Sequence, residues 1–181
     1  MTNNKKLIGK KIALIIAWRD FRDDEYFIPK ELFEKAGAEI KNVSTQLGQA
    51  RGADGGEVEI DLTLTDLKVK EFDAIVFVGG PGALKYLDNT LSYAIINEAI
   101  KNNKVLAAIC ISPVILAKSN LLSGKKATVW SSSLIKEPIA TLKEHGLLYE
   151  NKPVVVDGNL ITANGPAAAR AFAEAIIEIL K

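Results

Sequence analysis

The feature of this sequence that most restricts its fold is a repeated alternation of short apolar runs with longer amphipathic stretches. The runs 11–17 (KIALIIA), 73–78 (DAIVFV) and 104–110 (KVLAAIC) are rich in Ile, Val and Ala. Such runs are typical of strands that are buried on both faces of a sheet. The stretch 91–103 instead repeats apolar residues at helical spacing. Strands that alternate with helices predict an α/β protein with a mostly parallel sheet covered on both faces.

The other segments extend this alternation to both ends of the chain. Further helices are expected within 29–37, 112–124, 133–146 and 165–180, and further strands at 38–44 and 126–130. Gly55-Gly56 indicates a hairpin or an irregular excursion, and Asp157-Gly158 within 152–163 indicates a second hairpin. Because no repeat, linker or low-complexity stretch interrupts the pattern, residues 1–181 are expected to form a single domain.

Charge and cysteine content exclude several classes of partner and location. Lys and Arg number 23 against 22 Asp and Glu, so there is no electrostatic case for binding nucleic acid or an anionic membrane. The polar and basic N-terminus leads into an apolar run that is too short to cross a bilayer and has no cleavage site after it. With one Cys, no intrachain disulfide is possible, and the cytoplasm is the expected location.

The single cysteine, Cys110, ends an apolar strand and precedes a helix that begins at Ser112-Pro113. A thiol at a helix N-terminus has a lowered pKa, and its thiolate is the reactive form. Ala108 and Ser112 are small, as the flanks of a nucleophile elbow must be, and the next backbone N–H can stabilise an oxyanion. The alternative is a structural cysteine, since free Cys is often buried.

Two other segments are expected at the same edge of the sheet. The turn GGPG follows the strand 73–78, and its N–H groups are suited to an anion, although a tight turn explains the glycines equally well. It lacks the Lys-Ser/Thr of a phosphate-binding loop. The charged segment 18–29 (WRDFRDDEYFIP) is interpreted as a solvated loop or helix start, one of whose acids could reach the cysteine.

Taken together, four segments resemble the ThiJ/PfpI superfamily, which includes the parkinsonism-associated deglycase and archaeal intracellular peptidases and is class I glutamine amidotransferase-like. They are DDEYFIP, DAIVFVGGPGA, VLAAICISPVILAKSNLLSGKKAT and VVVDGNLITANGPAAARAFA. The resemblance covers nearly the whole chain. It implies a flavodoxin-like three-layer sandwich and a homodimer or larger homo-oligomer.

The resemblance also implies roles for individual residues. Cys110 matches the family's nucleophile, and Glu25, four residues before Pro29, matches the glutamate that hydrogen-bonds it as a protonated acid. Gly80 and Ile111 match the residues whose backbone N–H groups face the site. Further residues expected at the pocket are Gly79, Ser112 and Trp130.

The histidines that relatives use are absent from their usual places. Peptidase members carry histidine directly after the cysteine, where this chain has Ile111, and others carry it after KATV, where Trp130 stands. The only histidine, His145, lies near the end of a predicted helix, where a structural role is expected. A Cys-His dyad is therefore not expected.

These observations leave three functions open. The first is action on small reactive carbonyls, of the glyoxalase or deglycase type, or oxidation of Cys110 in response to peroxide. The second is an intracellular cysteine peptidase or other hydrolase, which would need a base, such as one from a partner subunit. The third is a non-enzymatic binding or chaperone-like protein. Neither a metal nor a cofactor is implied by the sequence.

Overall fold

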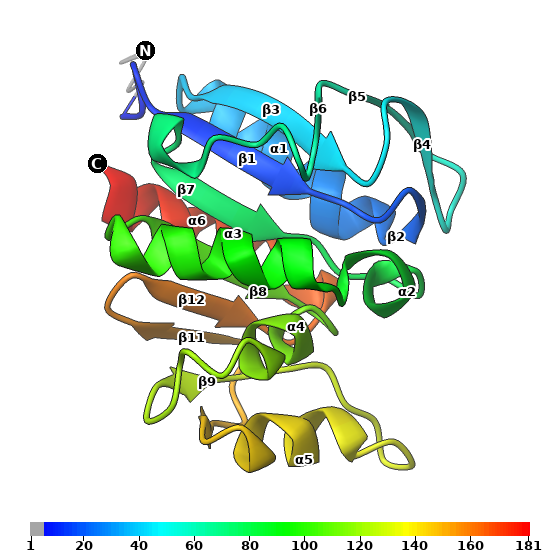
Figure 1. Cartoon of the computed structure of the whole chain (residues 1–181), viewed down its shortest axis with the longest axis vertical. Helices are drawn as coiled ribbons and strands as arrows, with labels where there is room; N and C mark the ends of the chain where they lie inside the picture. Colours follow the sequence, from blue (N-terminus) through cyan, green and yellow to red (C-terminus); the bar gives the residue numbers. More distant parts are fainter. Residues whose placement is uncertain (1–5) are drawn as a thin grey trace.

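The computed structural model describes residues 6–181, and a seven-stranded sheet forms its centre (Figure 1). The strands, given in spatial order, are β11 (Val154–Asp157), β12 (Leu160–Ala163), β8 (Val105–Ile109), β7 (Ala74–Phe77), β1 (Lys11–Ile15), β3 (Glu39–Ser44) and β6 (Leu62–Thr63). Neighbouring strands run parallel except β11 and β12, whose antiparallel hairpin turns at Asp157-Gly158. The predicted mostly parallel sheet is thereby confirmed. The basic stretch before β1 begins with residues 1–5, which lie outside the described part of the chain.

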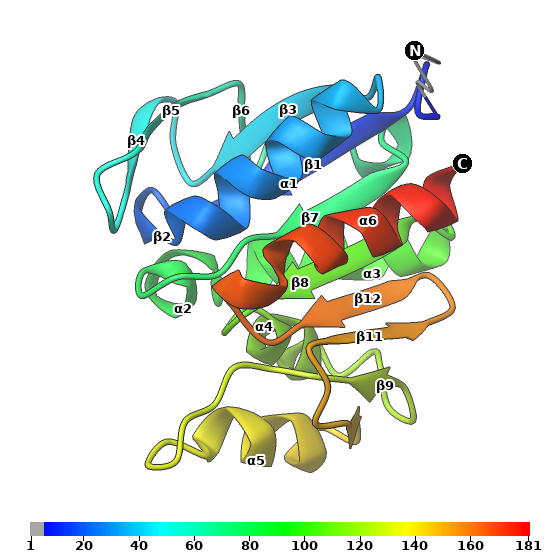
Figure 2. The ribbon, with the colours of Figure 1, turned by 180° about the vertical axis from the view of Figure 1, so that it is seen from behind.

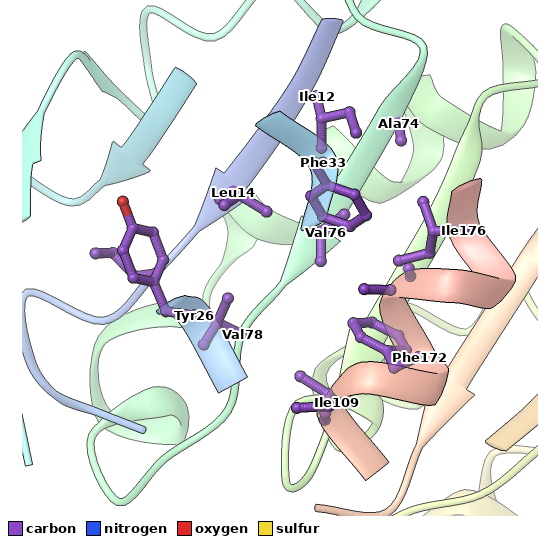
Figure 3. Packing of buried hydrophobic residues seen from close by; sticks show 14 of the residues in the cluster. Ile12, Leu14, Tyr26, Phe33, Ala74, Val76, Val78, Ile109, Phe172 and Ile176 are labelled. Carbon is purple, nitrogen blue, oxygen red and sulfur yellow. The ribbon is translucent and has the colours of Figure 1, made fainter. Parts of the chain in front are cut away.

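Helices cover both faces of this sheet and give the expected three layers. On one face α1 (Asp23–Lys35) packs beside α6 (Ala169–Leu180), as Figure 2 shows. On the other face lie α3 (Thr90–Lys101) and α4 (Pro113–Lys118). Because side chains alternate along a strand, Ile12 and Leu14 of β1 face the first layer, where Figure 3 shows them near Phe33. Ala13 and Ile15 enter the second core.

Smaller elements extend the fold at its ends. A three-stranded sheet contains β2 (Arg19–Phe21), β4 (Gly48–Gly52) and β5 (Glu57–Ile60). The predicted hairpin at Gly55-Gly56 is confirmed, because β4 and β5 pair antiparallel around it. The remaining elements are η1 (Val69–Glu71), α2 (Ala83–Leu87), β9 (Lys126–Ala127), α5 (Glu137–Glu144), β10 (Leu148–Tyr149) and η2 (Pro166–Ala168).

Three expected boundaries are wrong. The first helix begins at Asp23 and not at Pro29, which lies inside it. Residues 23–29 of the charged segment therefore contain the helix start, one of the two interpretations given above, and Arg19–Phe21 of the same segment form β2. The expected strand 126–130 is limited to its first two residues. Beyond them Thr128 N–H donates to the Thr162 hydroxyl (2.9 Å) and Trp130 N–H donates to Cys110 O (2.8 Å), which draws the chain toward the end of β8. The predicted helix 112–124 ends at Lys118.

The parallel strands β1, β7, β8 and β12 all end at one edge of the sheet, where α2 and the start of α1 also lie (Figure 1). In open α/β sheets, sites form beyond the carboxyl ends of the strands, and especially where strand order reverses. Within residues 6–181, no helix has the length and apolar character needed to span a bilayer.

Candidate active site

Cys110 directly follows β8 and occupies a strained turn. Its φ is +64°, in the left-handed region that non-glycine residues rarely adopt. Two backbone hydrogen bonds hold it there: its N–H donates to Ala163 O (2.8 Å), and its carbonyl accepts from Trp130 N–H (2.8 Å). This is the sharp turn that the sequence predicts. It is fixed from both sides, by the end of β12 and by the segment after β9.

The turn after β7 brings Glu25 against the cysteine. A Cβ atom on Gly79 would lie 2.4 Å from Glu25 Oε2 and 2.6 Å from Cys110 Cβ, so only glycine leaves room for both side chains. Gly80 has a φ of +118°, and a Cβ there would lie 2.3 Å from the backbone nitrogen of Arg22. Arg22 N–H donates to Gly79 O (2.9 Å). The glycine turn and the start of α1 are therefore locked together.

Glu25 projects from the first turn of α1 and is fully buried. Neither carboxyl oxygen has a well-formed hydrogen bond to residues 6–181. Burial raises the pKa of Glu25 to about 7, although the Cys110 thiol, the Arg22 guanidinium and the Gly79 N–H each lower it in part. A carboxyl group with this pKa exchanges protons near neutral pH, as a general acid or base must.

The expected lowering of the Cys110 pKa is wrong in direction. Burial is the largest cause that raises the pKa of the thiol, and the charge and hydrogen bonding of Glu25 raise it further. The backbone N–H groups of Ile111 and Gly80 lower it in part. The helix that follows has only six residues. Each group therefore affects the titration of the other, and the two titrate as a coupled pair.

Cys110 lies in the wall of a cavity of about 390 Å³. Its lining residues are Arg22, Gly80, Pro81, Leu84, Cys110, Ile111, Trp130 and Pro166. Sequence reasoning places Gly80, Ile111 and Trp130 at the pocket but misses Arg22, Leu84 and Pro166, which come from three separate parts of the chain. The one available signal was that Arg22 lies in the charged segment, three residues before Glu25.

Two expected pocket residues lie behind the cavity and do not line it. Ser112 is fully buried, and its hydroxyl donates to Val78 O (2.8 Å), which ties the start of α4 to the end of β7. Gly79 contacts Glu25 and Cys110 as described above.

His145 lies away from the cavity. It caps the C-terminus of α5, and its Nδ1 is 2.7 Å from Asn120 Oδ1. The cavity lining contains no histidine among the described residues. In the same part of the chain, no group of three or more His, Cys, Asp or Glu side chains is placed to hold a metal ion.

A cysteine on a strained strand-to-helix turn, backed by a buried carboxyl and set in a parallel α/β sandwich, defines a nucleophile-elbow protein of the flavodoxin-like class. The model of the DJ-1/PfpI family matches residues 10–179. The chain belongs to the DJ-1/PfpI family.

Individual relatives agree with this assignment. An uncharacterised Methanocaldococcus jannaschii protein is 43% identical over 172 residues, which are 94% of this chain and 81% of that one. A Thermococcus kodakarensis protein named a deglycase is 30% identical over 93% of this chain and 99% of its own length. The crystal structure of a ThiJ/PfpI domain protein from Brachyspira murdochii has a TM-score of 0.89 and 34% identity, and covers 95% of this chain and 98% of that one.

Proposed function

We propose that this protein is a cysteine-dependent enzyme of the deglycase or glyoxalase type, which acts on small reactive carbonyl compounds. The observation that supports this most strongly is the placement of the Cys110 sulfur at a mainly apolar cavity, with the buried Glu25 carboxyl behind it. A cavity of about 390 Å³ suits a small molecule. Relatives named as deglycases fit the same function.

The first chemical step needs only groups of this chain. The Cys110 sulfur adds to the electrophilic carbonyl carbon, and the thiol proton passes to the Glu25 carboxylate. The carbonyl oxygen becomes an alkoxide, which the N–H groups of Gly80 and Ile111 are oriented to stabilise. Glu25 then returns the proton to that oxygen and completes a hemithioacetal. Because its pKa is about 7, Glu25 can accept and release the proton at neutral pH.

This step removes the need for a stable resting thiolate. The raised pKa of the thiol keeps Cys110 largely protonated until a substrate arrives, and the shared proton moves as the new C–S bond forms. The same site supports an oxidative role, in which two molecules of hydrogen peroxide react in turn. Each transfers one oxygen atom to the sulfur and leaves as water, first giving the sulfenic acid and then the sulfinate, which the two N–H groups hold.

The test is consumption of glyoxal and methylglyoxal by the purified protein. Cys110→Ser should abolish turnover, because the hydroxyl is a far weaker nucleophile, whereas His145→Gln should retain it. Intact mass after peroxide treatment tests the oxidative role in the same samples. If wild type and Cys110→Ser consume the carbonyls at the same rate, the proposal is wrong. If that common rate equals the rate without protein, a binding or chaperone-like role takes its place.

Peptide hydrolysis is the competing outcome of the same experiment. A Bacillus subtilis relative, YraA, carries a provisional cysteine-protease name. Cleavage of a fluorogenic peptide that is lost in Cys110→Ser, without carbonyl turnover, would establish the hydrolase function instead. The engagement of His145 with Asn120 argues against it, since the family's usual imidazole is then missing from the site.

Two further proposals concern the setting of this chemistry. We infer a cytoplasmic location, because a single free thiol with this role needs a reducing compartment. We also infer a homodimer or larger homo-oligomer, which the family resemblance implies. The exposure of Leu134 (91%) and Ile135 (44%), in the segment after Trp130, supports self-association. Native mass spectrometry of wild type and Leu134→Ser tests this directly.

A further inference from the structure

The cavity lining includes a charged residue that the carbonyl chemistry described above does not use. Arg22 is the one charged residue among the eight described residues of the lining. The remaining surface is formed by the Gly80 backbone, the Cys110 sulfur and the apolar residues Pro81, Leu84, Ile111, Trp130 and Pro166. A positive charge in a small, mostly apolar cavity attracts an anionic group more strongly than it would in open water.

The position of Arg22 is set by its own backbone. It is the N-cap residue of α1, and its N–H donates to Gly79 O (2.9 Å). Its carbonyl accepts from Glu25 N–H (3.2 Å), so the backbone of Arg22 is held both to the start of α1 and to the glycine turn beside Cys110. The guanidinium therefore extends from a fixed point at the edge of the site.

The present partner of Arg22 leaves most of its donors free. Nη1 lies 3.3 Å from Asp54 Oδ2, and the two side chains are 33% and 59% exposed. Ion pairs with this exposure contribute little, and a better placed anion displaces them easily. A guanidinium has five N–H donors in a planar fork that matches both oxygens of a carboxylate.

We propose that Arg22 determines specificity at this site and that the cavity accepts small electrophiles which carry a carboxylate or a phosphate. The anionic group binds the guanidinium, and the electrophilic carbon is held at Cys110. Glu25 is not among the described residues that line the cavity, so the anionic group meets Arg22 and not this carboxyl. The inference deepens the proposed function by naming its substrate class and relies on the same cavity, but its test requires no turnover.

The test compares two alkylating agents of nearly equal size, iodoacetate and iodoacetamide. In each reaction the sulfur forms a C–S bond with the methylene carbon, iodide leaves, and the thiol proton is lost. Because Cys110 is the only cysteine, intact mass measures both rate constants without ambiguity. The ratio of the iodoacetate rate to the iodoacetamide rate cancels any change in the thiol itself, since both reagents report on the same sulfur.

The expected result is a ratio above that of glutathione for the wild type and a fall of about tenfold in Arg22→Gln, as the loss of a charge-assisted contact predicts. Arg22→Lys should give an intermediate ratio, because it keeps the charge and loses the fork. Arg170→Gln is the matched control: it removes the same charge from the exposed face of α6 and should leave the ratio unchanged.

Two results would overturn the inference: an unchanged ratio in Arg22→Gln, or an equal fall in Arg170→Gln, which would show an effect of net charge alone. Near-ultraviolet circular dichroism checks that each variant is folded, and Arg22→Lys remains informative if Arg22→Gln is not. A protein that shows the anion preference but does not consume glyoxals keeps this inference while the proposed reaction fails. A protein that consumes glyoxals but shows no anion preference keeps the proposed reaction, and this inference fails.

Discussion

Asp23 and Glu25 lie only two residues apart in the first turn of α1, on opposite sides of it, and their side chains contact different parts of the molecule. On one side Asp23 accepts two backbone hydrogen bonds from the β4–β5 turn, from Asp54 N–H (2.9 Å) and Gly56 N–H (2.6 Å). On the other side Glu25 is fully buried beside Cys110 and accepts no well-formed bond from residues 6–181. A satisfied carboxylate stabilises structure, whereas an unsatisfied one retains the ability to exchange a proton.

Glycine admits the carboxyl group on both sides. A Cβ on Gly52 or Gly56 would lie 2.3 Å from an oxygen of Asp23, and one on Gly79 would lie 2.4 Å from Glu25 Oε2. On both sides of the turn, the backbone of a glycine therefore lies close to the carboxyl group. What separates them is the group that the carboxyl meets, which is a pair of N–H donors for Asp23 and a thiol for Glu25.

The largest expected difference between the two acids is in reactivity. Glu25→Gln should lower carbonyl turnover and the rate of Cys110 alkylation at pH 7 by about two orders of magnitude or more, because an amide cannot accept the thiol proton. Asp23→Asn should retain most of the carbonyl turnover and most of the Cys110 alkylation rate. Steady-state kinetics and intact-mass alkylation measure the two quantities.

The pH dependence provides the control for this prediction. At alkaline pH hydroxide removes the thiol proton without help, so the alkylation rates of wild type and Glu25→Gln should converge. Equal losses of turnover and alkylation rate in Glu25→Gln and Asp23→Asn at pH 7 would mean that both acids only support the fold. Glu25 would then have no separate role in reactivity.

The second difference is in how stability depends on pH. The pKa of Glu25 is raised from 4.5 to about 7, so the folded state binds more protons than the unfolded state between these values. The free energy of unfolding should therefore fall as pH rises from 4.5 to 7, by about 3 kcal/mol for this group, and then level off. Glu25→Gln should lack this contribution.

Urea unfolding of wild type and Glu25→Gln at several pH values isolates the effect, because the other carboxyl groups are common to both proteins and cancel in the difference. Asp23→Asn is the comparison on the other side of the helix turn. A difference between wild type and Glu25→Gln that stays constant with pH would show that folding does not shift the pKa of Glu25.

The sequence carries enough information for the sheet and for part of the site. The strands β7 and β8 are wholly apolar and β1 is apolar after Lys11, so their burial on two faces is readable from local pattern, and Cys110 follows β8 without a gap. The start of α1 is harder to read, because Pro29 lies in the interior of the helix, where proline is unusual.

The rest of the site depends on packing between distant segments. The raised pKa of the Cys110 thiol comes from burial and from Glu25, and local reasoning about a helix N-terminus cannot supply either. Arg22 and Pro166 meet in one cavity only after β1 and β12 have taken their places in the sheet. Residue identity thus predicts the nucleophile, while tertiary contacts decide its proton affinity and its surroundings.

A smaller effect is expected on the structural side of the turn. Asp23→Asn should reduce the free energy of unfolding by about 2 kcal/mol, because an amide offers one acceptor where two N–H groups require one each. Asp24→Asn is the matched control, since Asp24 is exposed in the same turn and should change stability little. Urea unfolding at pH 7 measures both, and equal values for the two variants would contradict the assigned role of Asp23.

The smallest expected effect links the two sides through Arg22. Its exposed ion pair with Asp54 joins the cavity to the same β4–β5 turn that Asp23 holds by backbone contacts. Asp54→Asn removes the competing carboxylate but keeps the backbone N–H that Asp23 accepts. The iodoacetate-to-iodoacetamide ratio should therefore rise by about threefold, in proportion to the weak exposed pair that is lost. Asp66→Asn removes an equal charge from an exposed position between β6 and η1 and should leave the ratio unchanged. A fall in the ratio on Asp54→Asn would mean that Asp54 positions the guanidinium for the anion and does not compete with it.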